Sequence, residues 1–116
     1  MRGTLYWAAI DLSRPTRPVC IVQAESINRT APSLIAVPVT PTAPRAGWPL
    51  TIEVPAGAAG LTVTSWLQVT KPLTIARDRL REEIGELPTD LLANLSSALS
   101  VVLALGPTRQ SMSLVV

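Results

Sequence analysis

A helical repeat occupies residues 89–103 of the chain, which read TDLLANLSSALSVVL. Its apolar residues recur three and four positions apart, as they do along one face of an α-helix. Thr89 is the expected N-cap, and Gly106 followed by Pro107 is the expected end of the helix. The expected buried face consists of Leu91, Leu92, Leu95, Ala98, Leu99, Val102 and Leu103.

The sequence before this helix has a different pattern. Proline and glycine recur at short intervals and leave apolar or alternating runs between them, which is typical of strands. Short strands followed by one amphipathic helix predict a mainly β (α+β) fold, in which the helix closes a strongly curved sheet or small barrel. The predicted strands are residues 4–10, 19–23, 34–40, 50–54 and 65–69, with a shorter one around 73–75 and a helical turn over 77–83.

Composition limits the possible functions. A chain of 116 residues, 47% of them hydrophobic, is expected to fold as one domain, and a net charge of +2 does not by itself indicate a nucleic-acid binder. The absence of histidine excludes Ser-His-Asp triads and removes the commonest zinc ligand. Cys20 is the only cysteine, and its apolar neighbours predict a buried thiol. We find no signal peptide or membrane span and expect a cytoplasmic protein.

Two residues at strand ends are candidates for phosphate chemistry. Arg17 follows a polar loop and opens an apolar strand, where its guanidinium could bind phosphate oxygens or simply face solvent. Thr40 ends an apolar run, so its hydroxyl either serves a site or is that of an ordinary strand-end threonine. In the following loop, Arg45 and Trp48 could supply a charge and a stacking face, although tryptophan beside proline also packs in cores.

Several short motifs follow one another along nearly the whole chain. They are Arg2-Gly3, Leu5-Tyr6-Trp7, Arg17-Pro18-Val19, Asn28-Arg29, Val37-Pro38-Val39-Thr40, Glu53-Val54-Pro55, Gly60-Leu61, Arg79-Leu80, Ile84-Gly85 and Leu103-Ala104-Leu105. In this order the sequence resembles the MazF/PemK toxins of bacterial toxin–antitoxin modules.

The resemblance implies an SH3-like barrel of about five to seven strands with a C-terminal helix, in a domain over residues 1–106 followed by a tail over 107–116. It implies a homodimeric endoribonuclease that cleaves single-stranded mRNA at a short sequence by attack of the RNA 2'-hydroxyl, without metal or other cofactor, and that a MazE-like antitoxin inhibits. The family's catalytic arginine and threonine fall on Arg17 and Thr40. The residues expected to contact RNA are Gln23, Asn28, Arg29, Arg45, Trp48 and Lys71.

Two other functions fit the same fold. One is a barrel that binds DNA gyrase, as CcdB-type proteins do, although this chain lacks their C-terminal Trp-Gly-Ile and ends in Val115-Val116. The other is a family member that binds without cutting, a hypothesis that rests on departures from the family pattern at Ala9, Ala24 and Lys71.

Overall fold

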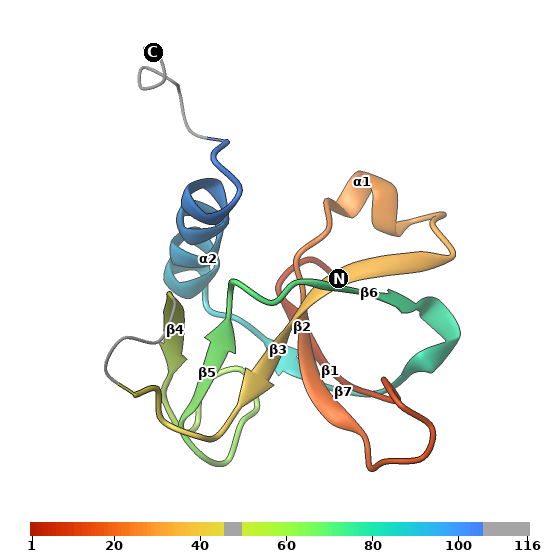
Figure 1. The fold of residues 1–116 in the computed structure, drawn as a ribbon, viewed down its shortest axis with the longest axis horizontal. Coiled ribbons are helices and arrows are strands. Elements are labelled where there is room, and N and C mark those ends of the chain that lie inside the picture. Colours follow the sequence, from red (N-terminus) through yellow and green to blue (C-terminus); the bar gives the residue numbers. More distant parts are fainter. Residues whose placement is uncertain (46–49, 106–116) are drawn as a thin grey trace.

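The computed structural model describes residues 1–45 and 50–105. These residues form seven strands of one sheet, two α-helices and a short 3-10 helix (Figure 1). In chain order the elements are β1 (Thr4–Ala8), β2 (Arg17–Ile21), α1 (Glu25–Asn28), β3 (Ser33–Thr40), β4 (Thr51–Val54), β5 (Ser65–Gln68), β6 (Leu73–Ala76), the 3-10 helix (Arg77–Arg79), β7 (Leu80–Glu86) and α2 (Thr89–Val102).

β3 is the strand on which the sheet is built. The strand order is β4-β5-β3-β2-β1-β7, with β6 paired to β3 as well. One edge of β3 pairs with β2, while the other pairs first with β6, over residues 33–36, and then with β5, at Val39 and Thr40. Pro38 lies between these two ladders and has no N–H to donate. The proline therefore lies where the outer edge of β3 changes partner.

The sheet curves but does not close into a ring, because β4 and β7 stand at its two ends and no ladder between the described strands joins them. The turn after β4 instead packs against β7, backbone on backbone. A side chain on Gly60 would overlap the carbonyl oxygen of Ile84, and one on Gly85 would overlap that of Ala59. The predicted mainly β fold with a C-terminal helix is confirmed, and this glycine contact takes the place of strand pairing between the sheet ends.

The predicted strands agree with β1 to β6 to within two residues at each end. The helical turn predicted over 77–83 is wrong beyond its first residues, because Leu80–Glu86 forms β7. This end strand exposes its polar residues 81–83, so its sequence lacks the apolar alternation of a half-buried strand. α1 also went unpredicted, since its four residues are too few to show a helical period.

The C-terminal helix is confirmed as α2, which buries Leu95 and Ala98 in the core. Its predicted N-cap is wrong by one residue. The carbonyl of Pro88 accepts the N–H of Leu92 at 2.9 Å, so Pro88 is the cap and Thr89 is already helical. Within the described ranges no helix has the length and apolarity to cross a membrane, and α2 itself has 14 residues where about 20 are needed.

α2 ends earlier than the sequence predicts. Ala104 adopts a left-handed conformation with φ 56°, and its N–H donates to the carbonyl of Val101. The N–H of Leu105 donates to the carbonyl of Ser100 at 2.8 Å, which completes a Schellman motif. The helix therefore ends without Gly106 and Pro107, which lie outside the described residues, and Leu103 is exposed rather than part of the buried face.

The core lies on both faces of the β1-β2-β3 sheet. Leu5, Cys20 and Val37 lie on the face that α2 covers, whereas their chain neighbours Val19 and Ala36 pack on the other face. The predicted burial of Cys20 is confirmed, and burial raises the pKa of its thiol to about 12.

A hydrogen-bonded network holds α1 against the start of the chain. The Glu25 carboxylate accepts the backbone N–H of Arg2 at 2.9 Å and the side-chain amide of Asn28 at 3.2 Å. Asn28 is buried and also donates to the carbonyl oxygen of Gln23 at 2.8 Å, while the Gln23 amide donates to Asn28 Oδ1. These bonds fix the connection between β2 and β3.

Gly85→Ala is expected to lower the free energy of unfolding by about 1–3 kcal/mol, as overpacking does, because its methyl group would meet the backbone at Ala59. Gly57→Ala is the matched control, since a methyl group there meets no atom within 4 Å and adds only the strain of a positive φ. Urea unfolding of both variants tests the contact. Equal losses in the two variants would contradict it.

Cys20 is expected to resist thiol reagents in the native protein, because the thiol is buried and its raised pKa keeps it protonated. Iodoacetamide at mildly alkaline pH should leave the folded chain unmodified by mass spectrometry and modify it fully in guanidinium. Rapid labelling of the folded protein would show that the β2 core opens readily.

Hydrogen bonds from the Arg2 N–H and the Asn28 amide, together with the Met1 amine, lower the pKa of Glu25 to about 2. A carboxylate with a lowered pKa in the folded state stabilises that state above its unfolded pKa and loses the effect as pH falls. Glu25→Gln should therefore destabilise the protein at neutral pH, and the difference from wild type should shrink between about pH 4.5 and 2. Urea midpoints across this range test it, and a constant difference would contradict it.

Candidate functional site

The register of β2 and β3 brings the two catalytic candidates to one end of the sheet. The antiparallel pairing of β2 with β3 runs from Ile21–Ala36 to Val19–Pro38, and Arg17 and Thr40 each lie two residues beyond its last pair. The arginine and threonine therefore stand at the same end of two adjacent strands, although 22 positions of sequence lie between them.

The side chain of Arg17 is exposed, and among the described residues it makes no hydrogen bond or ion pair that would neutralise its charge. Thr40 is half-buried, and its Oγ1 accepts the N–H of Thr42 at 3.1 Å, which fixes the position of the hydroxyl. The hydroxyl hydrogen remains available to donate. The pair thus offers a guanidinium fork and a hydroxyl donor to an anion.

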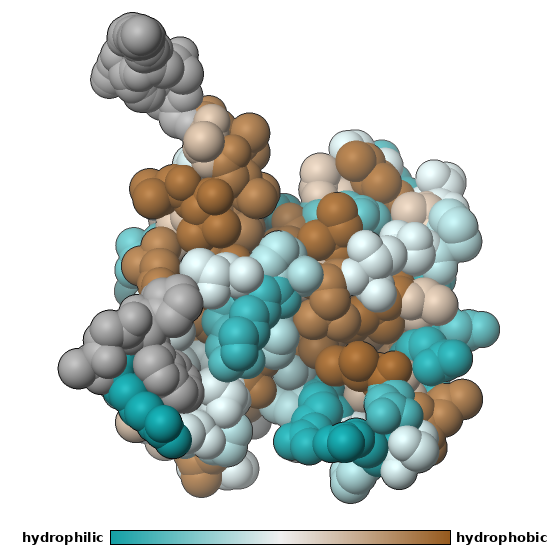
Figure 2. All heavy atoms as spheres, in the orientation of Figure 1, coloured by the Kyte–Doolittle hydropathy of each residue, from teal (hydrophilic) through white to brown (hydrophobic). Residues whose placement is uncertain are grey.

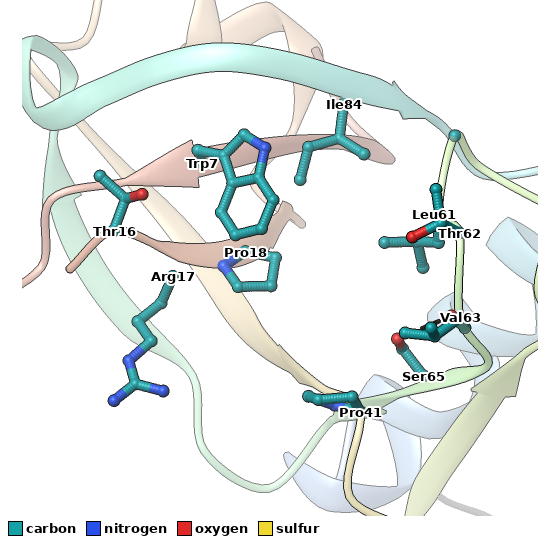
Figure 3. Close-up of a pocket in the computed structure, with 11 residues that line it drawn as sticks. Trp7, Thr16, Arg17, Pro18, Pro41, Leu61, Thr62, Val63, Ser65 and Ile84 are labelled. Atoms are coloured by element: carbon teal, nitrogen blue, oxygen red, sulfur yellow. Dashed lines mark hydrogen bonds between the residues drawn. The ribbon is translucent and has the colours of Figure 1, made fainter.

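A cavity of about 530 Å³ lies beside Arg17 (Figure 3). Trp7 of β1 and its cross-strand partner Pro18 form one wall, and the segment 60–65 forms the opposite wall. In Figure 3 the guanidinium of Arg17 points away from the indole of Trp7, so the charge lies at the rim. The lining residues are Trp7, Thr16, Arg17, Pro18, Pro41, Gly60, Leu61, Thr62, Val63, Ser65 and Ile84.

The structure does not gather all the predicted RNA contacts at this end. Gln23, Asn28 and Arg29 lie beyond the far end of β2, next to the start of β3, and that eight-residue strand spans roughly 23 Å. Arg29 is exposed there, but Asn28 is buried and Gln23 is half-buried. The side chains of Gln23 and Asn28 bond to each other and to backbone. The side-chain amides of Gln23 and Asn28 therefore stabilise the connection between β2 and β3.

The other two candidates in the described structure lie apart from each other. Arg45 is exposed in the segment that follows Thr40. Lys71 is exposed in the connection between β5 and β6, and its chain neighbour Pro72 lines a pocket with Gln23 and Ile35, at the far end of β2 from Arg17. Trp48 lies outside the described residues.

Acidic residues and the cysteine do not cluster in the part of the chain that the structure describes. No group of three or more cysteine, aspartate or glutamate side chains there could hold a metal ion, and the chain has no histidine. The donors that the site presents are instead nitrogen–hydrogen and hydroxyl groups, which suit phosphate oxygens.

Trp7 is a cavity residue that its motif, Leu5-Tyr6-Trp7, does not by itself identify. The alternation of β1 carries the relevant signal, because Leu5 and Trp7 share one face of that strand. Leu5 is fully buried, whereas Trp7 is 40% exposed. The face of β1 that packs in the core at Leu5 therefore forms the wall of the cavity at Trp7.

The chain is similar to known proteins along most of its length. The family described as PemK-like, MazF-like toxin of type II toxin–antitoxin system matches residues 1–103. Endoribonuclease MazF6 of Mycobacterium tuberculosis is 30% identical over 112 residues, which cover 90% of this chain and 96% of that protein. Endoribonuclease EndoA of Bacillus subtilis is 30% identical over 111 residues, which cover 90% and 94%.

Solved structures share the fold. An endoribonuclease from a mycobacterial species superposes with a TM-score of 0.76 at 23% identity, over 92% of this chain and 93% of that one. A MazE–MazF structure from Deinococcus radiodurans gives 0.71 at 26% identity, over 89% and 94%. The chain belongs to the PemK-like, MazF-like toxins of type II toxin–antitoxin systems.

Proposed function

We propose that this protein is an endoribonuclease toxin that cleaves single-stranded mRNA at a short sequence. The observation that carries the proposal is the placement of Arg17 and Thr40 at the same end of two paired strands, with the arginine charge unpaired within the described residues. The relatives named as endoribonucleases support the same activity.

In the proposed mechanism, the RNA supplies its own nucleophile. The 2'-hydroxyl oxygen attacks the adjacent phosphorus and the bond from phosphorus to the 5'-oxygen breaks. The proton lost from the 2'-hydroxyl is balanced by one gained at the 5'-oxygen. The products are a 2',3'-cyclic phosphate and a 5'-hydroxyl. The protein needs to orient the strand and stabilise the charge that builds on the phosphate oxygens.

Arg17 and Thr40 have different roles in this mechanism. The Arg17 guanidinium is a permanently charged, planar donor, so it suits the extra negative charge of the transition state. The Thr40 hydroxyl donates to a phosphate oxygen, and its bond from the Thr42 N–H holds it in place. The exposed cations Arg29, Arg45 and Lys71 contact the strand elsewhere, chiefly through phosphates. Because the site offers no cluster of metal ligands among the described residues, we propose that cleavage proceeds in EDTA.

The proposal includes the partners typical of such a module. A cognate antitoxin inhibits the enzyme, as the solved complex of a mycobacterial endoribonuclease with its antitoxin suggests. The protein acts as a cytoplasmic homodimer. The apolar residues Val101, Leu103 and Leu105 are exposed near the end of α2, where Figure 2 shows a hydrophobic surface. This surface is the proposed subunit contact.

Arg17→Ala is expected to lower the cleavage rate by about 10²–10³-fold or more, as loss of a donor to a developing oxyanion does. Arg17→Lys should recover only part of the rate, because an ammonium lacks the planar fork. Thr40→Val should lower the rate and Thr40→Ser should recover it, since serine restores the hydroxyl. Mapping the 5' ends of a long mRNA after incubation in EDTA measures all four.

Circular dichroism and urea unfolding should show that these variants fold like wild type. If folded Arg17→Ala cuts as fast as wild type, the assigned site is wrong. If the wild type itself makes no cuts, the protein acts by binding alone.

A further inference from the structure

We propose that the cavity beside Arg17 binds one base of the RNA strand, from a nucleotide next to the scissile phosphate, with the base stacked on Trp7. The inference rests on the proposed function and adds a base subsite to it. Its volume of about 530 Å³ lies within the range of pockets that hold small ligands.

The first support is the exposed face of Trp7. The indole is 40% exposed, although Trp7 lies on a strand face that is otherwise core. Tyr6 and Trp66, the other aromatic residues in the described part of the chain, are both half-buried. Unstacked RNA bases stack on aromatic surfaces of this kind. Trp7 is therefore the strongest stacking platform in the described structure.

The second support is the composition of the cavity walls. The ring of Pro18 lies beside Trp7, and Leu61 faces them from the other side (Figure 3). Polar groups are few: Thr62 is exposed and makes no hydrogen bond within the described ranges, whereas the hydroxyl of Ser65 already donates to the carbonyl of Val63 at 3.1 Å. An apolar slot with one available hydroxyl fits a base with an apolar face and a polar edge.

The third support is the connection between the cavity and the charge. Arg17 and Pro18 are consecutive residues of β2, so their side chains leave the strand on opposite faces. Pro18 faces the cavity beside Trp7, and Arg17, which also lines the cavity, directs its guanidinium away from the indole at the rim (Figure 3). The base and phosphate of a nucleotide are separated only by a ribose, so we place the phosphate at this rim and the base of the same nucleotide in the cavity.

The charge of the cavity favours nucleic acid over a basic or neutral ligand. Its lining residues include one arginine and no aspartate or glutamate. An apolar side chain of an acidic peptide is the competing occupant, and the experiment must separate it from a base.

The test uses an RNA oligonucleotide that contains a cut site mapped for the wild type, together with a series in which one nucleotide at a time is abasic. For wild type, one abasic position next to the cut should lower kcat/KM by roughly tenfold, a value within the stacking range. For Trp7→Ala, the intact substrate should lose a similar factor and that abasic position should cost nothing further. Trp7→Phe should restore most of the effect.

Two further variants guard against effects on folding. Ile27→Ala removes an exposed apolar side chain from α1, far from the cavity, and should keep the wild-type abasic profile. Val63→Trp adds bulk from the exposed wall opposite Trp7 without touching the core, and should reproduce the loss seen in Trp7→Ala.

The outcomes separate the subsite from the activity. If folded Trp7→Ala and Val63→Trp cut with the wild-type abasic profile, the base subsite is wrong while the ribonuclease proposal stands. If these variants keep that profile but bind an acidic antitoxin peptide more weakly, the cavity serves a protein and the proposal is likewise overturned. If the wild type cuts no RNA, the failure lies with the proposed function, which Arg17→Ala tests independently.

Discussion

The two-sided pairing of β3 is the constraint on which the structure depends. One eight-residue strand joins β2 on one edge and both β6 and β5 on the other. The edge of β3 that faces away from β2 pairs with two strands, so its hydrogen-bond ladder is interrupted between them. Pro38, which has no backbone N–H to donate, lies at this interruption. The change of partner turns β5 and β4 away from the plane of the other strands (Figure 1). That turn creates the two core faces and the space beside Arg17.

The pairing of β2 with β3 also determines where the two site residues lie. Arg17 and Thr40 stand at the ends of these strands, and the residues further along each strand are buried and paired. A register shift of one residue would move the side chains of a strand to the opposite face of the sheet. The hydrophobic pattern of Val19, Cys20 and Val37 thus positions two polar side chains that contribute little to the core themselves. The same core that stabilises the fold aligns the proposed chemistry.

The sequence predicts those strands and that helix whose burial produces a recognisable pattern of apolar residues. The strands around Val19 and Val37 appear as apolar runs because both of their faces are buried, and the helix around Leu95 is periodic because one side faces the core. β7 escaped detection because an end strand with exposed residues 81–83 needs no such period. The end of α2 was misplaced because Ala104 adopts a conformation that usually calls for glycine. For β7, pairing with β1 decides the structure, and for the end of α2 the local hydrogen bonds of Ala104 and Leu105 do so.

The candidate site was predictable in part, for a related reason. Arg17 and Thr40 stand at strand boundaries, which proline and polar neighbours mark in the sequence, and the family motifs point to the same residues. Asn28 is also polar, yet its side chain is buried and donates a hydrogen bond to the backbone carbonyl of Gln23 in the β2–β3 connection. The side chain has this structural role because buried backbone groups need hydrogen-bond partners. Only the fold distinguishes these two uses of a polar residue. The fold also shows that Trp7 lines the same cavity as Arg17. A chain with no phenylalanine and few other aromatic residues has few surfaces for stacking a base, so whatever base selectivity it gains by stacking within the described structure must be concentrated there.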